Sequence, residues 1–205
     1  MRIGIIGPIG SGKSLLSKKL AAYYHCALLE EPVEKNEYLP YFYNDKETFA
    51  MLSQNAFYSS LFLLMWKTKE NPNVVCDSTL FSNLVFTELL RLEGIMSAME
   101  VALTYAIADE HLKRIPDLDL QIVLVRPTEQ LFKNVRKRGR TIEKGQEDYL
   151  KFHYANYYDV LRRIFKNYKV PEKRVLWLEL EDMEEEAEFA RIVALIEKCY
   201  AEAIK

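Results

Sequence analysis

Short apolar runs alternate with longer helical patterns along the chain. Met1 to Gly7 is an apolar run that ends in glycine, and Lys13 to Tyr24 then places leucine and tyrosine side chains at helical spacing. The other apolar runs of strand length are Cys26 to Leu29, Val74 to Cys76, Leu120 to Val125 and Val175 to Leu180. Strands that alternate with helices predict an α/β fold, here a five-stranded parallel sheet flanked by helices.

The helical patterns between the apolar runs are long. They predict helices at Lys46 to Trp66, Leu80 to Leu92, Ser97 to Lys113, Glu129 to Lys137, Glu147 to Asn167 and Glu184 to Ala203. The acidic run Glu179 to Glu188 is interpreted as the solvated start of the last helix, because acidic side chains are favoured at helix N-termini. Since we find no internal repeat or low-complexity linker, residues 1–205 are predicted to form a single domain.

Composition and charge narrow the class of protein. Hydrophobic residues make up 49% and charged residues 28%, which is typical of a folded chain rather than a disordered one. The formal net charge of −2 provides no global basic field, so we expect no nucleic acid polymer as a partner. Cys26, Cys76 and Cys199 are an odd number without metal-type spacing, which favours reduced, structural thiols.

The location is expected to be cytoplasmic. The N-terminus lacks the charged region, apolar stretch and cleavage site of a signal peptide. The apolar runs also fall short of the roughly 18 residues that indicate a membrane span, so no membrane partner is expected.

The turn between the first predicted strand and helix contains a phosphate-binding motif, G-x-x-x-x-G-K-[ST]. It is spelled Gly7-Pro8-Ile9-Gly10-Ser11-Gly12-Lys13-Ser14. Glycines let backbone N–H groups converge on phosphate oxygens, Lys13 can reach the β- and γ-phosphates, and Ser14 can ligate Mg²⁺. A chance glycine turn would not explain why all the diagnostic positions coincide between a strand and a helix. The motif predicts nucleotide binding in a P-loop NTPase fold. It does not specify a reaction, because ATPases, GTPases and small-molecule kinases all use it.

Carboxylates follow the second predicted strand, where Leu28 and Leu29 lead into Glu30, Glu31 and Pro32. Open α/β sheets bind ligands at this edge, and a carboxylate there can position a hydroxyl nucleophile and accept its proton. Solvated or helix-capping acids would produce the same local pattern.

Beyond these motifs, the chain resembles the deoxynucleoside kinase family, which includes deoxyadenosine, deoxyguanosine and deoxycytidine kinases. The resemblance covers about residues 1–165 and is carried by Glu31-Pro32-Val33-Glu34-Lys35-Asn36, Phe42-Tyr43-Asn44-Asp45, Gln54, Asp77-Ser78-Thr79, and Arg136-Lys137-Arg138-Gly139-Arg140 followed by Glu143. It implies a three-layer fold with a helical, arginine-bearing lid at about residues 134–150. It also implies transfer of the γ-phosphate of ATP to the 5′-hydroxyl of a deoxyribonucleoside. The pattern leans towards the short bacterial branch and its purine substrates.

The resemblance also implies roles for individual residues. Glu31 would be the general base, and Tyr43 with Glu143 would bind the sugar 3′-hydroxyl. Gln54 would pair with the base edge, because its amide supplies a donor and an acceptor. Asp77 and Ser14 would lie near Mg²⁺, and Asn83 would lie near the base. Arg138 and Lys13 would be catalytic cations. Arg136, Arg138 and Arg140 would bind ATP.

Each of these residues also has an ordinary structural explanation. Phe42 and Tyr43 would also suit a core, Gln54 would suit an exposed helix, and Arg136 to Arg140 would suit the solvated end of a helix. The long apolar faces of Phe49 to Trp66 and Leu84 to Leu92 either form the homodimer interface that the resemblance suggests or simply cover the sheet.

The sequence departs from the family pattern at several positions. Ser78 and Asn134 stand where relatives often carry phosphate-facing arginines, and Asn83 replaces an acid. Lost arginine contacts to a transferring phosphoryl group cost on the order of 10³-fold in rate. Arg136 and Lys137 are close enough along the chain to compensate. An active kinase is therefore weighed against a catalytically impaired nucleotide-binding relative that acts as a partner subunit or sensor, and against a thymidylate-type nucleotide kinase.

Overall fold

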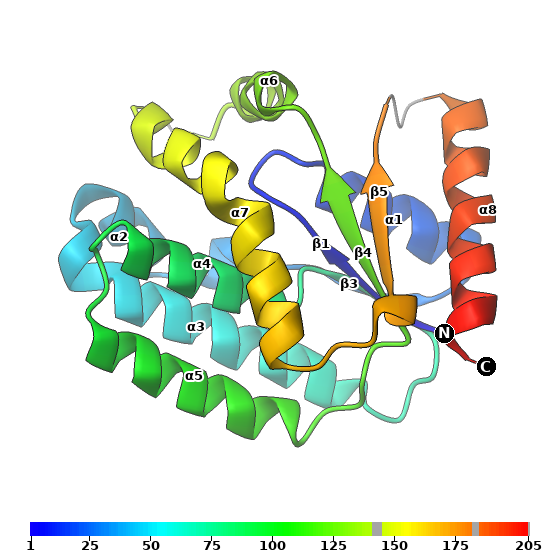
Figure 1. Ribbon diagram of the computed structural model, residues 1–205, viewed down its shortest axis with the longest axis horizontal. Helices are drawn as coiled ribbons and strands as arrows, with labels where there is room; N and C mark the ends of the chain where they lie inside the picture. Colours follow the sequence, from blue (N-terminus) through cyan, green and yellow to red (C-terminus); the bar gives the residue numbers. More distant parts are fainter. Residues whose placement is uncertain (141–144, 182–184, 205) are drawn as a thin grey trace.

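The computed structural model describes residues 1–140, 145–181 and 185–204, and these contain a parallel sheet between two layers of helices (Figure 1). The strands are β1 (Arg2–Ile6), β2 (Ala27–Leu29), β3 (Val74–Asp77), β4 (Leu120–Val125) and β5 (Val175–Glu179). Their order across the sheet is β2-β3-β1-β4-β5, and every neighbouring pair is parallel. The predicted five-stranded parallel sheet is confirmed.

The helices agree with the predicted ones to within about two residues. They are α1 (Lys13–Tyr23), α3 (Lys46–Lys67), α4 (Leu80–Leu92), α5 (Ala98–Leu112), α6 (Thr128–Arg138), α7 (Glu147–Asn167) and α8 (Glu186–Ala203). The sequence pattern missed α2 (Leu39–Asn44) and the short 3₁₀ turns Val33–Lys35 and Glu172–Arg174. A helix of this length completes less than two turns, so it shows no apolar period.

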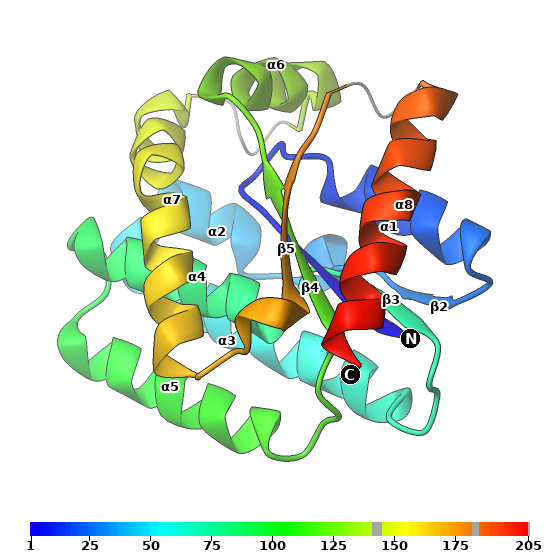
Figure 2. The same ribbon diagram turned by 45° about the vertical axis from the view of Figure 1, so that its right-hand side comes forward.

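The apolar strands bury side chains on both faces of the sheet. Ile3 and Ile122 pack with α1 and α8, whereas Val123 packs with the layer of α3, α4, α5 and α7 on the other face. Figure 2 shows α1 and α8 together on one side. Burial on both faces explains why these strands are continuous apolar runs instead of alternating ones.

A third cluster of buried residues lies at the carboxyl end of the sheet, where α2, α3, α4, α6 and α7 meet. It includes Phe42, Leu131, Tyr149 and Tyr154. Ile9 from the loop after β1 and Leu39 from the segment after β2 pack against this cluster. It therefore lies beside the edge where parallel sheets bind ligands.

Two expectations about individual residues can be tested here. The three cysteines are free, as expected. The interpretation of Glu188 as part of a solvated helix start is wrong, because its side chain is buried, pairs with Arg191 at 2.7 Å and accepts the Glu181 N–H. Among the residues described, no helix is both long and apolar enough to cross a membrane.

Candidate active site

The phosphate-binding loop connects β1 to α1 as predicted. Gly10 and Gly12 have φ values of 83° and 97°, a left-handed conformation that glycine adopts without steric cost. Leu16 N–H bonds to Gly12 C=O, so the first turn of α1 starts directly at the loop. The N–H groups of such a first turn have no partner within the helix, and with the helix dipole they attract anions.

Lys13 lies inside the loop that precedes it. Its Nζ donates to the Gly7 carbonyl at 2.9 Å and to the Pro8 carbonyl at 3.3 Å. Burial lowers the pKa of Lys13, and the nearby carboxylates of Glu31 and Asp77 act in the opposite direction. The amine is therefore held beside two acids, at the position from which a P-loop lysine reaches phosphate.

A wide groove runs along the loop towards α6. It is lined by Gly10 to Ser14, by Glu31 and Asp77, and by basic side chains that include Lys133, Lys137, Arg138 and Arg140. The combination of loop amides and cations suits a polyphosphate chain.

Asp77 and Ser14 are the residues that fit a Mg²⁺ ion in this groove. Asp77 is buried at the end of β3, and its Oδ1 has no hydrogen-bond partner among the described residues. No group of three or more His, Cys, Asp or Glu side chains in the described ranges could hold a metal by itself. The unpaired Asp77 oxygen beside the groove suits Mg²⁺, which is commonly held by one or two protein oxygens together with substrate phosphates and water.

A second, more enclosed cavity adjoins the groove. The predicted substrate residues Tyr43, Gln54 and Asn83 all line it, together with the aromatic rings of Phe42, Phe57, Phe86 and Tyr149. Gln54 Oε1 and Asn83 Nδ2 are buried without a hydrogen-bond partner among the described residues. Unpaired polar atoms are costly when buried, so one free acceptor and one free donor among aromatic rings indicate a flat, polar-edged ligand.

The two cavities share the charged residues Lys13, Glu31, Arg138 and Arg140 and the apolar Val33. Glu31 follows β2, and burial raises the pKa of its carboxyl group, while the charge of Lys13 opposes that shift. The pKa of a general base is optimal near the working pH, and raising a carboxylate pKa moves it in that direction. A group bound in one cavity would thus meet a phosphate bound in the other beside this carboxylate.

The residues predicted for the lid divide into those that reach the cavities and those that do not. Arg138 and Arg140 line both cavities and Lys137 lines the groove, whereas the exposed Arg136 lines neither. Of the two cations considered as substitutes for missing arginines, only Lys137 is in place. Glu143 lies outside the described residues.

Ser78 has a backbone that few side chains adopt. Its φ is 87°, and it is buried in the turn between β3 and α4. Burial raises the pKa of Glu31, and the Ser78 hydroxyl opposes that rise. A non-glycine residue at positive φ costs free energy and is found disproportionately at functional sites. The β3–α4 turn therefore places Ser78 beside the proposed base, although the serine carries no charge.

Comparisons with known proteins agree with this geometry. The model of the family described as deoxynucleoside kinase matches residues 3–200. The chain belongs to the deoxynucleoside kinase family. It is 29% identical to a deoxyguanosine kinase of Lactobacillus acidophilus over 174 residues, which are 82% of this chain and 73% of that one. It is 24% identical to a deoxyadenosine kinase of the same organism, over 83% of this chain and 82% of that one.

Solved structures show the same fold. A deoxyadenosine kinase from M. mycoides with bound dATP superposes with a TM-score of 0.80 at 21% identity, over 96% of this chain and all of that chain. The same enzyme with dCMP and a flexible dCDP gives a TM-score of 0.79 at 20% identity, over 97% of this chain. The deoxynucleoside kinase described here thus has the expected P-loop fold. The family match and the curated relatives that are named kinases do not favour an impaired relative.

Sequence reasoning missed several groups that line these cavities. Lys18, Arg126, Gln130 and Lys133 border the groove, and Val33, Leu39, Phe57, Phe86 and Tyr149 border the second cavity. Phe86 comes from the middle, and Tyr149 from the first turn, of an ordinary helical pattern. Without a known contact between α4 and α7, their spacing predicts only a packed helix face.

Proposed function

We propose that this kinase binds ATP in the groove and a deoxyribonucleoside in the second cavity, and transfers the γ-phosphate to the sugar 5′-hydroxyl. The observation that carries this proposal is the wall of Lys13, Glu31, Arg138 and Arg140 that the two cavities share. A donor and an acceptor bound on either side would place the reacting atoms together there, which is how positioning accelerates transfer. The cytoplasm is the proposed location.

The residues at the shared wall would divide the chemistry. Glu31 accepts the proton of the 5′-hydroxyl as its oxygen attacks phosphorus, and the bond from phosphorus to the β-phosphate oxygen breaks. Lys13 with Arg138 and Arg140 offsets the charge that develops on the transferring phosphate and on the departing ADP. Mg²⁺, held by Ser14 and Asp77, would further neutralise the β- and γ-oxygens when bound.

The second cavity would hold the nucleoside by its flat faces and polar edge. Phe57 and Phe86 offer apolar ring surface for the base, and Tyr43 borders the cavity as the candidate for the sugar 3′-hydroxyl. Gln54 and Asn83 would meet the base edge with their unpaired acceptor and donor. Both amides are uncharged, and an adenine edge, with an amine donor beside a ring-nitrogen acceptor, complements them.

The preferred base can be measured directly. We expect ATP-dependent formation of deoxynucleoside monophosphate, with the purine deoxynucleosides showing a higher kcat/KM than deoxycytidine and thymidine. The relatives named deoxyguanosine and deoxyadenosine kinases support this order. Product from the four deoxynucleosides would be quantified by chromatography. A pyrimidine as the best substrate would contradict the base preference, and no product from any of them would contradict the proposed reaction.

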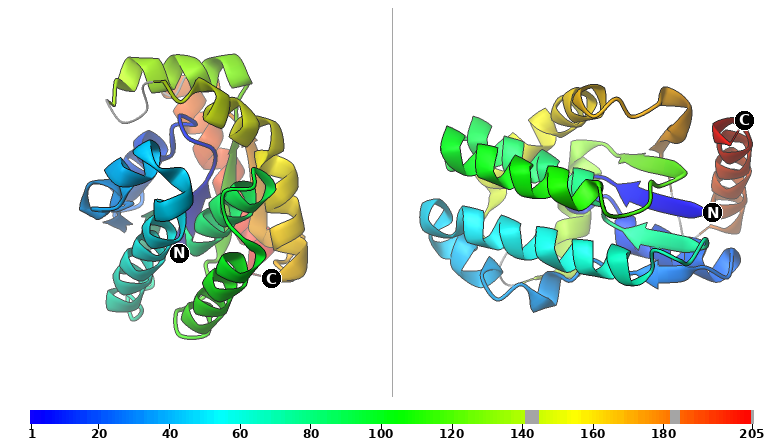
Figure 3. Two further views of the ribbon diagram at one scale, coloured as in Figure 1. Left: turned by 90° about the vertical axis from the view of Figure 1, so that its left-hand side faces the viewer. Right: turned by 90° about the horizontal axis from the view of Figure 1, so that it is seen from below.

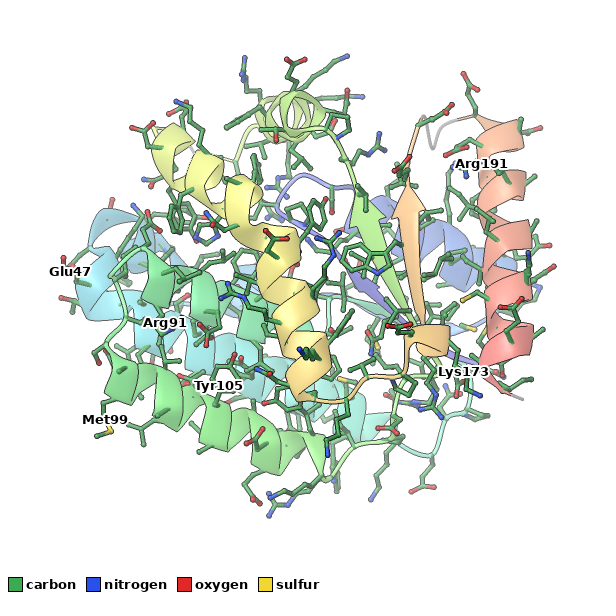
Figure 4. The ribbon with its side chains drawn as sticks, viewed as in Figure 1. Glu47, Arg91, Met99, Tyr105, Lys173 and Arg191 are labelled. Atoms are coloured by element: carbon green, nitrogen blue, oxygen red, sulfur yellow. The ribbon has the colours of Figure 1, made fainter. Side chains whose placement is uncertain are left out.

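We further propose a homodimer through the outer faces of α3 and α5. These helices lie side by side at one edge of the molecule (Figure 3), and their exposed apolar side chains include Leu52, Leu63 and Trp66 on α3 and Met99 and Leu103 on α5. Met99 is 69% exposed and points away from the body (Figure 4). Of the two alternatives left open for Leu84 to Leu92, we propose the internal one, because Leu84, Val85, Leu89 and Leu90 are buried within the chain.

Charge placed on this face should prevent association. The double variant Met99→Glu with Leu103→Glu is expected to be monomeric where the wild type is dimeric, because each carboxylate would be buried without a partner. Sedimentation velocity at micromolar concentration measures this. Ile204→Glu is the matched control, since Ile204 is also exposed but lies beyond α8. A wild type that sediments as a monomer, or a double variant that remains a dimer, would contradict the interface.

A further inference from the structure

The side chain of Asn134 connects α6 to the tip of the phosphate-binding loop. Its Nδ2 donates to the Gly10 carbonyl at 2.8 Å, and Gln130 Nε2 donates to Asn134 Oδ1 at 2.8 Å. Both amides line the ATP groove and are partly buried. The contact joins residues that are 124 positions apart in the chain.

The orientation of this amide pair follows from the groups involved. A backbone carbonyl can only accept, so Asn134 must present its nitrogen to Gly10 and keep its oxygen for Gln130. Gln130 and Asn134 are four positions apart and lie on the same face of α6. The resulting chain of hydrogen bonds, Gln130 to Asn134 to Gly10, has one consistent direction.

The loop tip is shaped to receive this contact. A Cβ atom at Gly10 would lie 2.7 Å from the Leu131 carbonyl oxygen and 3.0 Å from Val135 Cγ2, so only glycine lets the loop approach the α6 backbone this closely. Figure 2 shows α6 lying across the loop at the carboxyl end of the sheet. The loop and the helix are thus fitted together by packing as well as by the amide.

Asn134 also fixes the orientation of one peptide group. Ser11 N–H bonds to the Pro8 carbonyl at 3.1 Å, which closes a turn that has Gly10 at its positive-φ position. The Gly10 carbonyl belongs to the same planar trans peptide as the Ser11 N–H, so the two groups point in opposite directions. One hydrogen bond from α6 and one from Pro8 therefore hold both ends of this peptide.

We propose that Asn134 is a positioning residue for the phosphate donor. By holding the Gly10 carbonyl against α6, it keeps that oxygen from turning into the groove, where its partial negative charge would repel the triphosphate. This inference rests on the proposed function, since it assigns the groove to ATP. It also gives a role to a position where an arginine was expected: the side chain acts on the loop and not directly on phosphate.

Substitutions at Asn134 test this role. Asn134→Ala is expected to raise KM and Kd for ATP about 3- to 10-fold, which is the effect of losing one hydrogen bond, and to leave KM for the deoxynucleoside unchanged. Gln130→Ala, which keeps the bond to Gly10, should shift both constants in the same direction by less. Asn156→Ala is the matched control, because Asn156 Nδ2 makes a bond of the same length to Phe152 within α7, away from both cavities.

Asn134→Arg separates positioning from charge. If position 134 served the phosphates through charge, the Asn134→Arg enzyme would bind ATP more tightly than the wild type. We expect weaker binding, because the longer arginine side chain cannot fit between Gln130 and Gly10. Titration calorimetry with a non-hydrolysable ATP analogue measures Kd without turnover, so a failure of the kinase reaction would not be confused with a failure at Asn134. Unchanged Kd in Asn134→Ala, or tighter binding in Asn134→Arg, would overturn the proposal.

Discussion

Glu31→Gln is expected to lower kcat by about 10²- to 10⁴-fold, the contribution of a positioned general base, with little change in KM for the deoxynucleoside. The amide keeps the shape of the side chain but cannot accept the 5′-hydroxyl proton. Glu31 lies on the wall that the two cavities share, and no other described residue that lines both can accept a proton from the substrate. Lys13, Arg138 and Arg140 supply cations, and Val33 supplies apolar surface. An equal loss in kcat and kcat/KM would identify an interaction made only in the transition state.

The raised pKa of Glu31 adds a second readout of the same substitution. Burial raises the pKa of Glu31 in the folded state, so folding favours the protonated carboxyl group over the ionised one. Its contribution to the free energy of unfolding is therefore fully present below the unfolded pKa and is lost as pH rises through the folded pKa. At neutral pH, Glu31→Gln should therefore raise Tm while it removes activity. In the wild type, kcat should fall as pH falls through the raised pKa of Glu31, and this acid limb should be missing from the residual activity of the variant.

Glu30→Gln is the matched control for this prediction. Glu30 is the preceding carboxylate, but it is exposed and pairs with Lys18 at 3.0 Å, with both side chains 60% exposed. Such surface pairs contribute about 0–1 kcal/mol, so turnover and Tm should stay close to wild type. Near-normal kcat in Glu31→Gln, or equal losses in the two variants, would rule out Glu31 as the base.

Much of the fold could be predicted because each element has its own local pattern. β4 is a continuous apolar run, and its observed range of Leu120–Val125 is the predicted one. The range of α7, Glu147–Asn167, also agrees, because an apolar face at helical spacing persists along its full length. The loop from Gly7 to Ser14 could be predicted equally well, because its motif and its place between a strand and a helix are both local features of the sequence.

Contacts between distant segments could not be predicted in this way. The bond from Asn134 to Gly10 joins α6 to the phosphate-binding loop, and the two segments have no common sequence pattern. In the sequence, Asn134 stood out only as the absence of an arginine. Leu84 to Leu92 shows why an apolar helix face alone does not indicate an interface: α4 is covered by α3, α5 and α7. Which apolar surface remains exposed depends on the packing of all the helices, so it is known only once they are assembled.

Lys13→Met is expected to lower kcat/KM for ATP by about 10²- to 10³-fold, comparable to losing one preorganised donor at a developing charge. In the wild type, Lys13 Nζ is held by the Gly7 and Pro8 carbonyls beside Glu31 and Asp77, so the amine is already in place when ATP arrives. Methionine keeps the length and apolar character of the side chain and removes only the charge and its donors, so the fold should be retained. Steady-state kinetics with ATP varied at saturating deoxynucleoside would measure the loss.

Lys18→Met is the control for the loss of a cation from the same groove. Lys18 also lines the groove, but it is exposed and already paired with Glu30, so its removal should change kcat/KM for ATP by less than about 3-fold. A large difference between the two variants would show that the position of the amine matters and not the total charge of the groove. If Lys13→Met retained activity within the range of Lys18→Met, Arg138 and Arg140 would have to supply the phosphate charge, and Lys13 would lose its catalytic assignment.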